Sequence, residues 1–453
     1  MNELPKSWKT TEIGDLCNLI NGRAFKLQEW SDSGLPIIRI QNLNNKKSKF
    51  NYFSGDLDSR HLISNGDLLF AWSGTPGTSF GAHVWDGPDA ALNQHIFKIE
   101  FSDEHIECNF LRYAIDQKLD ELIGSAQGGV GLRHVTKGTF EKTEISFPPR
   151  AEQTRIAQRL DQLLAQVDTL KARIGAVLIL LVRFRKSVLA AAVSGRLTEE
   201  WRAQSSKATI SCRSEPSPSV NFAWHEVSLS DVARDFSYGS SAKSKPNGNV
   251  PVLRMGNIQN GVLDWTDLVF STDEAEVKKY TLHAGDILFN RTNSPELVGK
   301  TAIYRGERPA IYAGYLIRVR CSELLKPEFL NYCLNSPQGR HYCWQVKTDG
   351  VSQSNINAKK LAAFRFGLPE VEEQTEIIRQ VEQLFAFADQ LEAKVAAAKN
   401  RIDHLTQSIL AKAFRGELVP QDPNDEPASV LLERIKAQRA AAPKAKRTRK
   451  ASV

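Results

Sequence analysis

The sequence contains few residues of the kinds that build metal, redox or membrane sites. Its 453 residues include six cysteines, none of them in a CxxC pair, so neither a zinc ribbon nor a disulfide framework is expected. The longest strongly apolar run, Ile174 to Val182, is too short to span a bilayer. The first residues, MNELPKSWKT, lack the apolar core of a signal peptide. These absences predict a cytoplasmic protein with reduced thiols.

Motifs that carry catalysis are missing as well. The sequence has no GxxxxGKS/T phosphate loop, no HExxH pair and no clustered spacing of His and Cys. The glycine-rich segment Ser125–Leu132 lacks the strand–loop–helix setting of a dinucleotide site and is typical of a surface loop. We therefore expect no catalytic residue, no metal ion and no cofactor in this chain.

Basic charge is concentrated at the C-terminal end of the chain. The formal net charge is +7, but residues 434–453 hold eight basic side chains and no acidic one. Subtracting these eight from the 59 basic residues leaves 51, against 52 acidic ones. The body of the protein is close to neutral, so its net charge does not predict nucleic-acid binding by the folded domains.

The two halves of the chain repeat each other at a shift that reaches 221 residues in the helical regions. Residues 66–70 (GDLLF) match residues 285–289 (GDILF), and the EQT of residues 152–154 recurs at 373–375. Other segments match in the same order. A period this long indicates duplicated domains rather than a solenoid.

Each half has two zones. The first zone, 1–148 or 222–369, mixes short apolar runs with turn residues and predicts an α+β domain. The second zone, 149–200 or 370–418, follows a proline break and predicts a long helix. In the first zones we expect the strands Leu35–Ile40, Leu68–Trp72, His95–Phe101, Val250–Met255, Ile287–Asn290 and Leu316–Cys321, and the helices Asn109–Leu122 and Pro327–Asn335.

Apolar residues in both helical zones follow alternating spacings of four and three. The pattern runs from Ile156 to Val188 and recurs 221 residues later. Such heptads specify a coiled coil, here over roughly 50 Å of helix. Packing of each helix on its own domain is the alternative, but two equal seams favour an intramolecular antiparallel coiled coil, with the two α+β domains related by a pseudo-twofold axis. The expected seam residues are Ile156, Leu160, Leu163, Val167, Leu170, Ile174, Ile377, Val381, Leu384, Leu391, Val395 and Ile402.

Two further segments connect or end these zones. Residues 201–221 include a stretch rich in Ser, Pro and charge at 205–219, which predicts a flexible linker. Residues 419–453 are expected to form a short helix, Ala428–Ala441, followed by a basic disordered tail.

The remaining features favour DNA recognition. A duplicated body with a rigid spacer resembles a dimeric DNA reader, whose half-sites lie roughly 34–36 Å apart. Side chains that can read base edges occur in loops at matching places in both halves. Exposed Arg and Asn are common in loops, and most protein–DNA contacts go to phosphate, so each residue is a candidate only. The candidates are Arg39, Asn42, Trp72, Ser73, Arg133, His134, Arg254, Asn257, Asn290, Arg291, Asn293, Lys347, Ser352, Gln353 and Asn355.

Five helical segments carry a family resemblance: PPRAEQTRI at 148–156, LLAQVDTLKAR at 163–173, GRLTEEW at 195–201, LPEVEEQTEI at 368–377 and LTQSILAKAFRGEL at 405–418. On these segments the chain resembles the specificity (S, HsdS) subunit of type I restriction-modification systems, in particular the enteric group. The resemblance covers nearly the whole chain. The α+β zones match only in outline, as expected for target recognition domains.

The resemblance implies a division of labour among subunits. Each recognition domain would read one half of a bipartite, asymmetric site in double-stranded DNA, and the helical pair would set the gap. Two modification subunits would bring S-adenosylmethionine and the adenine-methylating site, and restriction subunits would bring the ATP- and Mg-dependent motor and the nuclease. The chain itself would be a non-catalytic scaffold for specificity, in defence against foreign DNA.

Two other functions stay open at this point. A coiled-coil adaptor without affinity for nucleic acid would explain the heptads but not the two α+β domains, and a salt-dependent gel shift separates the two functions. A stand-alone DNA-modifying enzyme would need an unrecognised site, and binding of labelled S-adenosylmethionine by the purified chain would support it.

Overall fold

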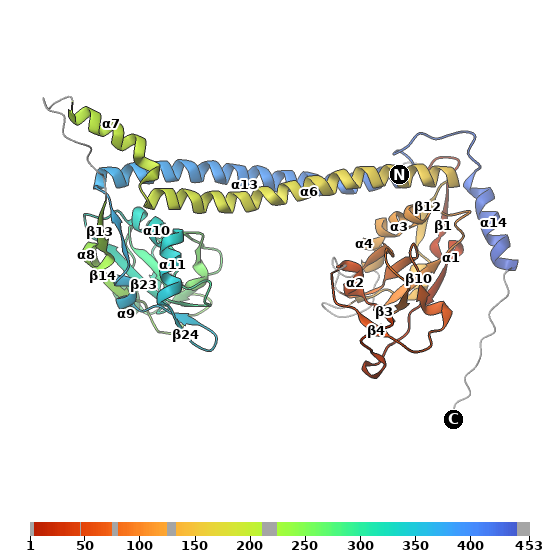
Figure 1. Cartoon of the computed structure of the whole chain (residues 1–453), viewed down its shortest axis with the longest axis horizontal. Helices are drawn as coiled ribbons and strands as arrows, with labels where there is room; N and C mark the ends of the chain where they lie inside the picture. The colour runs from red at the N-terminus through yellow and green to blue at the C-terminus, as the bar shows by residue number, and fades with distance from the viewer. Residues whose placement is uncertain (1–3, 46, 75–79, 125–132, 211–223, 442–453) are drawn as a thin grey trace. The chain divides into compact units, whose positions relative to one another are not determined.

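The computed structural model describes residues 4–45, 47–74, 80–124, 133–210 and 224–441. The chain forms two compact units, one of Met1–Arg173 with Ala398–Val453 and the other of Ile174–Ala397. Each unit contains one α+β domain and parts of the two long helices α6 (Arg150–Val193) and α13 (Val371–Phe414) (Figure 1). The predicted fold class, two α+β domains and two long helices, is confirmed.

The first domain is built on two four-stranded sheets. One is antiparallel, in the order β2-β10-β6-β8, and its strand β6 is fully buried. The other has the order β4-β3-β9-β5 and contains one parallel pair, β3 with β9. The strands are β2 (Asn18–Asn21), β3 (Leu35–Ile38), β4 (Asn51–Phe53), β5 (Leu62–Ile63), β6 (Leu68–Ala71), β8 (Gly81–Val84), β9 (Ala90–Leu92) and β10 (Ile96–Glu100).

Short strands and helices complete this domain. Strand β1 (Lys9–Glu12) pairs with β12 (Glu144–Phe147), and β7 (Ser73–Gly74) pairs with β11 (Arg133–His134). The helices are α1 (Ile13–Leu16), α2 (Ile40–Asn44), α3 (Cys108–Gln117), α4 (Leu119–Gly124) and α5 (Lys137–Glu141), with 3-10 turns at Leu27–Glu29 and Ser59–His61.

The second domain repeats the antiparallel sheet of the first, in the order β14-β23-β19-β21, and again has one parallel pair, β15 with β22, in a second sheet of order β18-β15-β22. The sheet strands are β14 (Ala233–Tyr238), β15 (Val250–Leu253), β18 (Val269–Ser271), β19 (Ile287–Asn290), β21 (Thr301–Ile303), β22 (Ile311–Tyr312) and β23 (Leu316–Cys321). The smaller pairings join β13 (His225–Ser228) to β26 (Arg365–Leu368), β16 (Ile258–Gln259) to β17 (Val262–Leu263), and β25 (Ser354–Asn355) to both β20 (Thr292–Asn293) and β24 (Thr348–Asp349). The helices are α8 (Leu229–Val232), α9 (Glu274–Tyr280), α10 (Pro327–Asn335), α11 (Pro337–Val346) and α12 (Ala358–Ala362), with a 3-10 turn at Met255–Asn257.

Most of the predicted strands and helices lie within two residues of those observed. The prediction was wrong at three places. The strand expected to reach Ile40 ends at Ile38, because the Asn42 side chain accepts a hydrogen bond from the Arg39 amide and begins helix α2. The strand expected to reach Met255 ends at Leu253 for the same reason, because Asn257 accepts from the Arg254 amide and Met255 begins a 3-10 turn. The helix expected over Asn109–Leu122 is two helices, which meet at Lys118, the residue that ends α3.

The two long helices pair antiparallel. In the second unit, Val188 and Ala192 share a core with Ile377 and Val381, and Arg185 lies 2.6 Å from Asp389. In the first unit, Lys171 lies 3.2 Å from Asp403. Of the predicted seam residues, Leu170 is 43% exposed and therefore contributes little to the seam. The buried seam residues are Ile156, Leu160, Val167, Ile377, Val381 and Ile402, and the half-buried ones are Leu163, Ile174, Leu384, Leu391 and Val395.

Helices also follow each long helix. After α6 come a 3-10 turn (Arg196–Thr198) and helix α7 (Glu199–Ile210), so the first residues of the predicted flexible linker are helical. Composition alone missed this helix because Ser and Thr lower helix propensity without excluding a helix. After α13 comes α14 (Ala428–Ala441), with the predicted bounds. Among the described residues, no helix is long and apolar enough to cross a membrane.

Candidate nucleic-acid interface

The residue after β6 in the first domain and the residue after β19 in the second make the same two backbone hydrogen bonds. After β6, the Trp72 amide donates to His95 O (3.3 Å), and Trp72 O accepts from the Val135 amide (2.9 Å). After β19, the Arg291 amide donates to Tyr315 O (3.0 Å), and Arg291 O accepts from the Ile356 amide (2.9 Å). Trp72 and Arg291 therefore occupy equivalent positions in the two domains.

The next residue in each domain forms a hydrogen-bonded pair across two short strands. Ser73 Oγ lies 2.9 Å from His134 Nδ1 across β7 and β11. Asn355 Nδ2 donates to Thr292 Oγ1 at 2.8 Å across β20 and β25. In both domains these pairings bring together two groups of candidates that lie about 60 residues apart in the sequence.

Aromatic and imidazole rings surround the pair in the first domain. The Trp72 ring stacks on Phe97 at 5.5 Å between centroids and lies 5.4 Å from His95 and 5.8 Å from His134. Burial lowers the pKa of His95, and the charges of His134 and Arg39 lower it further. The candidate Arg39 stacks over Trp30 at 5.7 Å. This site is therefore rich in aromatic and imidazole rings, and its surroundings favour the neutral form of His95.

The second domain has a cation at the corresponding place. The Arg291 guanidinium lies 4.9 Å from the centre of the Tyr238 ring and donates to Asn355 Oδ1 at 3.3 Å and to Gly314 O at 3.4 Å. Tyr238 is 42% exposed. Arginine stacked on an aromatic ring is a favourable cation–π arrangement that leaves the guanidinium edge available for hydrogen bonds.

Three candidate asparagines have structural partners. Asn42 and Asn257, each 2% exposed, accept from the amides of Arg39 and Arg254, at 3.1 and 2.8 Å. The amide nitrogens of these two asparagines donate to nearby backbone carbonyls. Asn290 is fully buried, and its side-chain oxygen accepts from the Thr292 amide at 3.3 Å. These contacts disfavour direct base reading by the three side chains and give them a role in shaping the loops.

Three of the other candidates of the second domain, Lys347, Ser352 and Gln353, lie on or directly beside the β24–β25 hairpin. Lys347 is paired with Asp349 at 2.6 Å and stacks over Trp344 at 4.3 Å. Ser352 and Gln353 are exposed in the turn. Asn293 accepts from the Ser294 amide at 2.8 Å. Arg254 is bound to Asp267 at 3.0 Å. In the first domain, Arg133 belongs to β11, and its side chain lies outside the described part of the structure, as does the loop that contains Gly128 and Gly129.

The sequence analysis missed His95 and Tyr238, which contact Trp72 and Arg291 through their rings. His95 could have been found from the repeat, because it is the equivalent of Tyr315 in the second domain. The carbonyl oxygens of the two residues accept equivalent backbone hydrogen bonds. Tyr238 lies at the end of β14 and carries no motif in the sequence.

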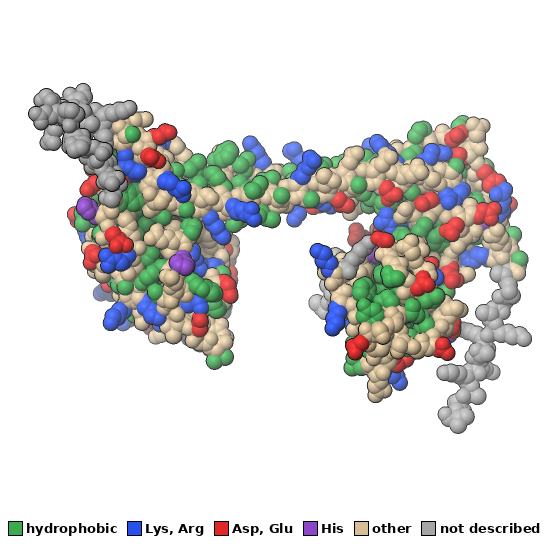
Figure 2. All heavy atoms as spheres, viewed as in Figure 1, with side chains coloured by type: hydrophobic (Ala, Val, Ile, Leu, Met, Phe, Trp, Pro, Cys, Tyr) green, Lys and Arg blue, Asp and Glu red, His purple; other side chains and the backbone are tan. Residues whose placement is uncertain are grey.

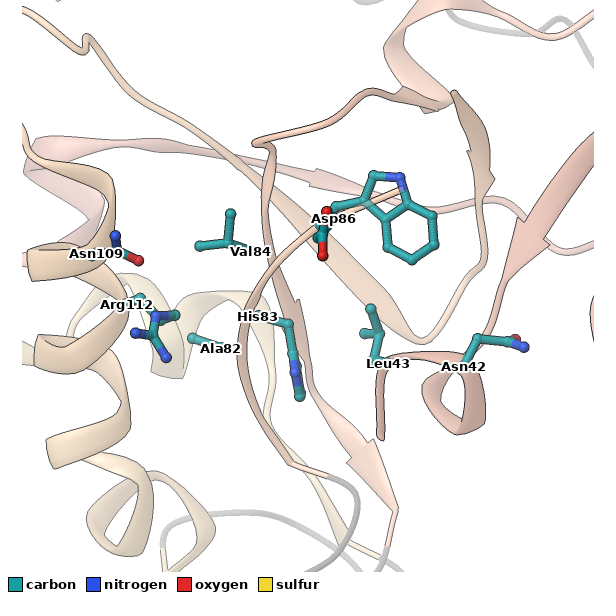
Figure 3. Close-up of a pocket in the computed structure, with 9 residues that line it drawn as sticks. Asn42, Leu43, Ala82, His83, Val84, Asp86, Asn109 and Arg112 are labelled. Carbon is teal, nitrogen blue, oxygen red and sulfur yellow. The ribbon is translucent and has the colours of Figure 1, made fainter. Parts of the chain in front are cut away.

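A pocket of about 240 Å³ opens in the first domain, with the candidate Asn42 in its lining (Figure 3). His83 from β8 and Arg112 from α3 line it. His83 Nε2 and Arg112 Nε are buried without a hydrogen-bond partner among the described residues. Beneath it, Asp116 accepts from the Ala82 amide at 2.9 Å, and burial raises the pKa of Asp116 to about 6. Within the described part of the chain, no three His, Cys, Asp or Glu residues group as a metal site would require.

A different kind of surface lies on helix α6. We call residues Leu178, Ile179, Leu180 and Val182 the apolar strip; they are 42%, 58%, 58% and 54% exposed, while Leu181 between them is buried. Figure 2 shows hydrophobic side chains at the surface of the helical pair. A helix that is apolar on all sides is normally covered by other protein. The strip therefore has the character of a docking surface.

The model of the protein family described as "Type I restriction modification DNA specificity domain" matches this chain twice, at residues 5–178 and 222–398. The chain belongs to this family of specificity subunits. It is 33% identical to the specificity subunit of the type I restriction enzyme EcoKI from Escherichia coli K12, over 99% of each chain. It is 34% identical to that of EcoBI from Escherichia coli, over 98% of this chain and 95% of that one. Specificity subunits are non-catalytic, and the predicted function of this chain as a DNA specificity subunit is confirmed.

Solved structures share the fold of this specificity subunit. A structure described as "Structural basis underlying complex assembly and conformational transition of the type I R-M system" has a TM-score of 0.65 at 20% identity and covers 92% of this chain and all of that one. The HsdS subunit from Thermoanaerobacter tengcongensis has a TM-score of 0.52 at 19% identity, covering 92% and 98%. At these identities the likeness concerns the fold.

Proposed function

We propose that this specificity subunit reads a bipartite, asymmetric sequence in double-stranded DNA, one half with each recognition domain. The observation that carries the proposal is the duplicated cross-strand pair, Ser73 with His134 and Thr292 with Asn355. One backbone framework presents an indole and imidazoles in the first domain, and a guanidinium and an amide in the second. Different hydrogen-bonding groups on equivalent frameworks suit a target whose two halves differ in sequence.

The candidate residues divide into two roles under this proposal. Asn42, Asn257 and Asn290 shape the loops. The others contact bases or phosphates around the two cross-strand pairs: Arg39, Trp72, Ser73, Arg133 and His134 in the first domain, and Arg254, Arg291, Asn293, Lys347, Ser352, Gln353 and Asn355 in the second. Most contacts of such a surface go to phosphate and position the protein, and a few read bases.

The domain boundaries follow the repeat. The recognition domains are 1–148 and 222–369, the spacer helices are 149–200 and 370–418, and residues 419–453 form the terminal helix and tail. Helix α7 extends to Ile210, so the first ten residues of the linker predicted at 201–221 are helical.

The subunit assembles with its partners through the helices. Two modification subunits bind the helical pair, and the apolar strip supports this because it is uncovered in the chain alone. S-adenosylmethionine lies on the modification subunits, and ATP and Mg lie on the restriction subunits that join them. The complex acts in the cytoplasm, where the DNA is.

The experiment that tests DNA reading is a genome-wide map of methylated adenines for variants of the two pairs. His134→Ala should change or abolish recognition of one half of the methylated sequence, and Asn355→Ala should affect the other half only. His404→Ala and Asn400→Ala are matched controls, because both residues are exposed on α13. An unchanged target in both pair variants would contradict the proposal.

A further inference from the structure

The first turn of each long helix carries a buried Glu–Gln pair that fastens the recognition domain to it. In the first unit, Gln153 is fully buried and Glu152 is 1% exposed. The Gln153 amide oxygen accepts from the Glu107 amide at 2.9 Å, and its nitrogen donates to Pro148 O at 3.0 Å and to His105 O at 3.4 Å. A single side chain thus binds the end of β12 and the loop that begins α3.

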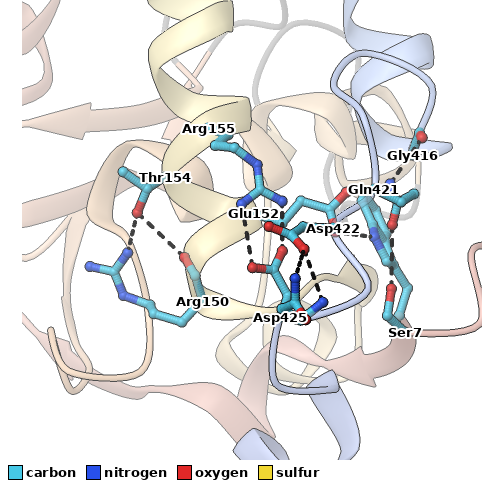
Figure 4. A network of polar contacts seen from close by, with 11 residues as sticks. Ser7, Arg150, Glu152, Thr154, Arg155, Gly416, Gln421, Asp422 and Asp425 are labelled. Carbon is cyan, nitrogen blue, oxygen red and sulfur yellow. Dashed lines mark hydrogen bonds and ion pairs between the residues drawn. The ribbon is translucent and has the colours of Figure 1, made fainter.

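The neighbouring glutamate binds the other side of the same domain. A carboxylate oxygen of Glu152 accepts from Trp8 Nε1 at 2.9 Å, directly before strand β1, and its other oxygen accepts from Gln421 Nε2. Figure 4 shows Glu152 on the first turn of α6, with Ser7 and Gln421 beside it. Together the pair therefore contacts both ends of the recognition domain.

The second unit repeats these contacts. Gln374, also fully buried, accepts from the Lys326 amide at 2.8 Å and donates to Leu324 O at 2.8 Å and Pro369 O at 2.9 Å. Glu373 accepts from Trp224 Nε1 at 3.1 Å. Its other oxygen accepts from Thr198 Oγ1 at 2.7 Å and from Arg202. The two recognition domains differ in their candidate DNA-reading groups, but equivalent hydrogen bonds attach each of them to its long helix.

The geometry of these hydrogen bonds restricts rotation of the recognition domain relative to the long helix. The Gln side chain makes hydrogen bonds in three directions, and all of its partners are backbone atoms whose positions are set by the domain. A rotation would break these bonds together and leave buried polar groups unpaired, which is costly. The hydrogen bonds between the Gln side chain and the backbone of the domain therefore fix the orientation of the domain relative to the long helix.

We propose that Gln153 and Gln374 are positioning residues for DNA reading: each fixes the orientation of its recognition domain on the long helix, and thereby limits the gap between half-sites that the complex accepts. This inference rests on the proposed function. It assigns to the two glutamines a part of specificity that involves no contact with DNA.

The test uses the full-length subunit assembled with its modification subunits. The target sequence of the wild-type complex is mapped first, and methylation is then measured on duplexes whose gap is shortened by one, unchanged or lengthened by one base pair. Gln374→Met keeps the length of the side chain but removes its hydrogen bonds. Gln390→Met, an exposed glutamine on the same helix, is the matched control. Trp224→Phe, which removes the N–H group that donates to Glu373 and keeps an aromatic ring, is a milder second variant if Gln374→Met does not fold.

The expected result is a loss of discrimination between gaps. The ratio of methylation on the correct gap to that on the altered gaps should fall about tenfold in Gln374→Met, as the loss of one or two net hydrogen bonds allows. The same bases in both half-sites should remain required, and the control should behave as wild type. An unchanged ratio in a folded variant, or a change in the bases required, would overturn the inference. A wild-type complex without sequence preference would instead overturn the proposed function.

Discussion

The indole nitrogen of Trp8 donates a hydrogen bond of 2.9 Å to Glu152, 144 residues further along the chain. Trp8 is 3% exposed, so the carboxylate would lose this donor without water to replace it. We expect Trp8→Phe to lower the free energy of unfolding by about 1–3 kcal/mol, because a buried charged acceptor is left with one bond fewer. Urea denaturation measures this. Trp344→Phe, at a 54% exposed position, should change it by less than about 0.5 kcal/mol.

Asp116 should make stability depend on pH. Its pKa is about 6 in the folded protein and 3.8 ordinarily, so the folded state holds the proton more tightly. Stability should therefore fall as pH rises from about 4 to about 6 and stay lower above that range. Asp116→Asn keeps an acceptor for the Ala82 amide without the charge, and should stabilise the protein by about 1–3 kcal/mol at pH 7.5 but not at pH 4. Denaturation midpoints at both pH values, with the exposed Asp120→Asn as control, check this. Equal effects at the two pH values would contradict it.

The apolar strip should matter for assembly and not for folding. The double variant Ile179→Ser/Leu180→Ser removes two side chains that are each 58% exposed. We expect little change in the unfolding free energy but at least about a tenfold loss of affinity for the modification subunits, since buried apolar anchors dominate interfaces. Co-purification and titration measure the affinity. Leu27→Ser, at a 74% exposed position on the first domain, is the control. Full affinity in the double variant would place the interface elsewhere.

The length of the paired helices α6 and α13 should determine the gap between the two half-sites. The ion pair between Lys171 and Asp403 identifies positions that face each other, so seven residues can be inserted after Leu170 and after Asp403 without shifting the flanking pairs. The inserts lengthen the helical pair by about 10 Å. The methylated half-sites should stay the same while the gap between them grows by about three base pairs. Retained methylation with the original gap would contradict this expectation.

The C-terminal basic residues are expected to bind DNA weakly. Arg439 already donates to Gly14 O at 2.6 Å and to Asn18 at 2.9 Å, and Arg434 is paired with Glu426. Truncation after Ala442 keeps these contacts and removes five basic side chains. If each binds a phosphate, the log–log salt slope of DNA affinity should flatten by up to about 4.5, with specificity unchanged. An unchanged slope would favour a partner contact or a role in solubility only.

The sequence was most informative where its pattern is periodic or repeated. The heptads predicted both long helices and their antiparallel pairing, because an apolar stripe this long has few ways to be buried. The candidate DNA-binding site was harder to predict from the sequence. Ser73 and His134 meet through two strands of two residues each, 61 residues apart, and such strands leave no period to detect. The burial of Asn42 and Asn257, whose side chains bind the backbone, could not be predicted either, because residue type does not reveal burial.

The uncovered apolar strip on α6 also has a consequence for gene dosage. A chain made in excess of its partners would present four exposed aliphatic side chains along one stretch of helix, and such surfaces associate with each other in solution. Balanced synthesis of the subunits, or folding of this chain in the presence of its partners, therefore keeps it from aggregating. If chains without partners associated through the strip, they would leave solution, and only complete complexes would remain to act on DNA.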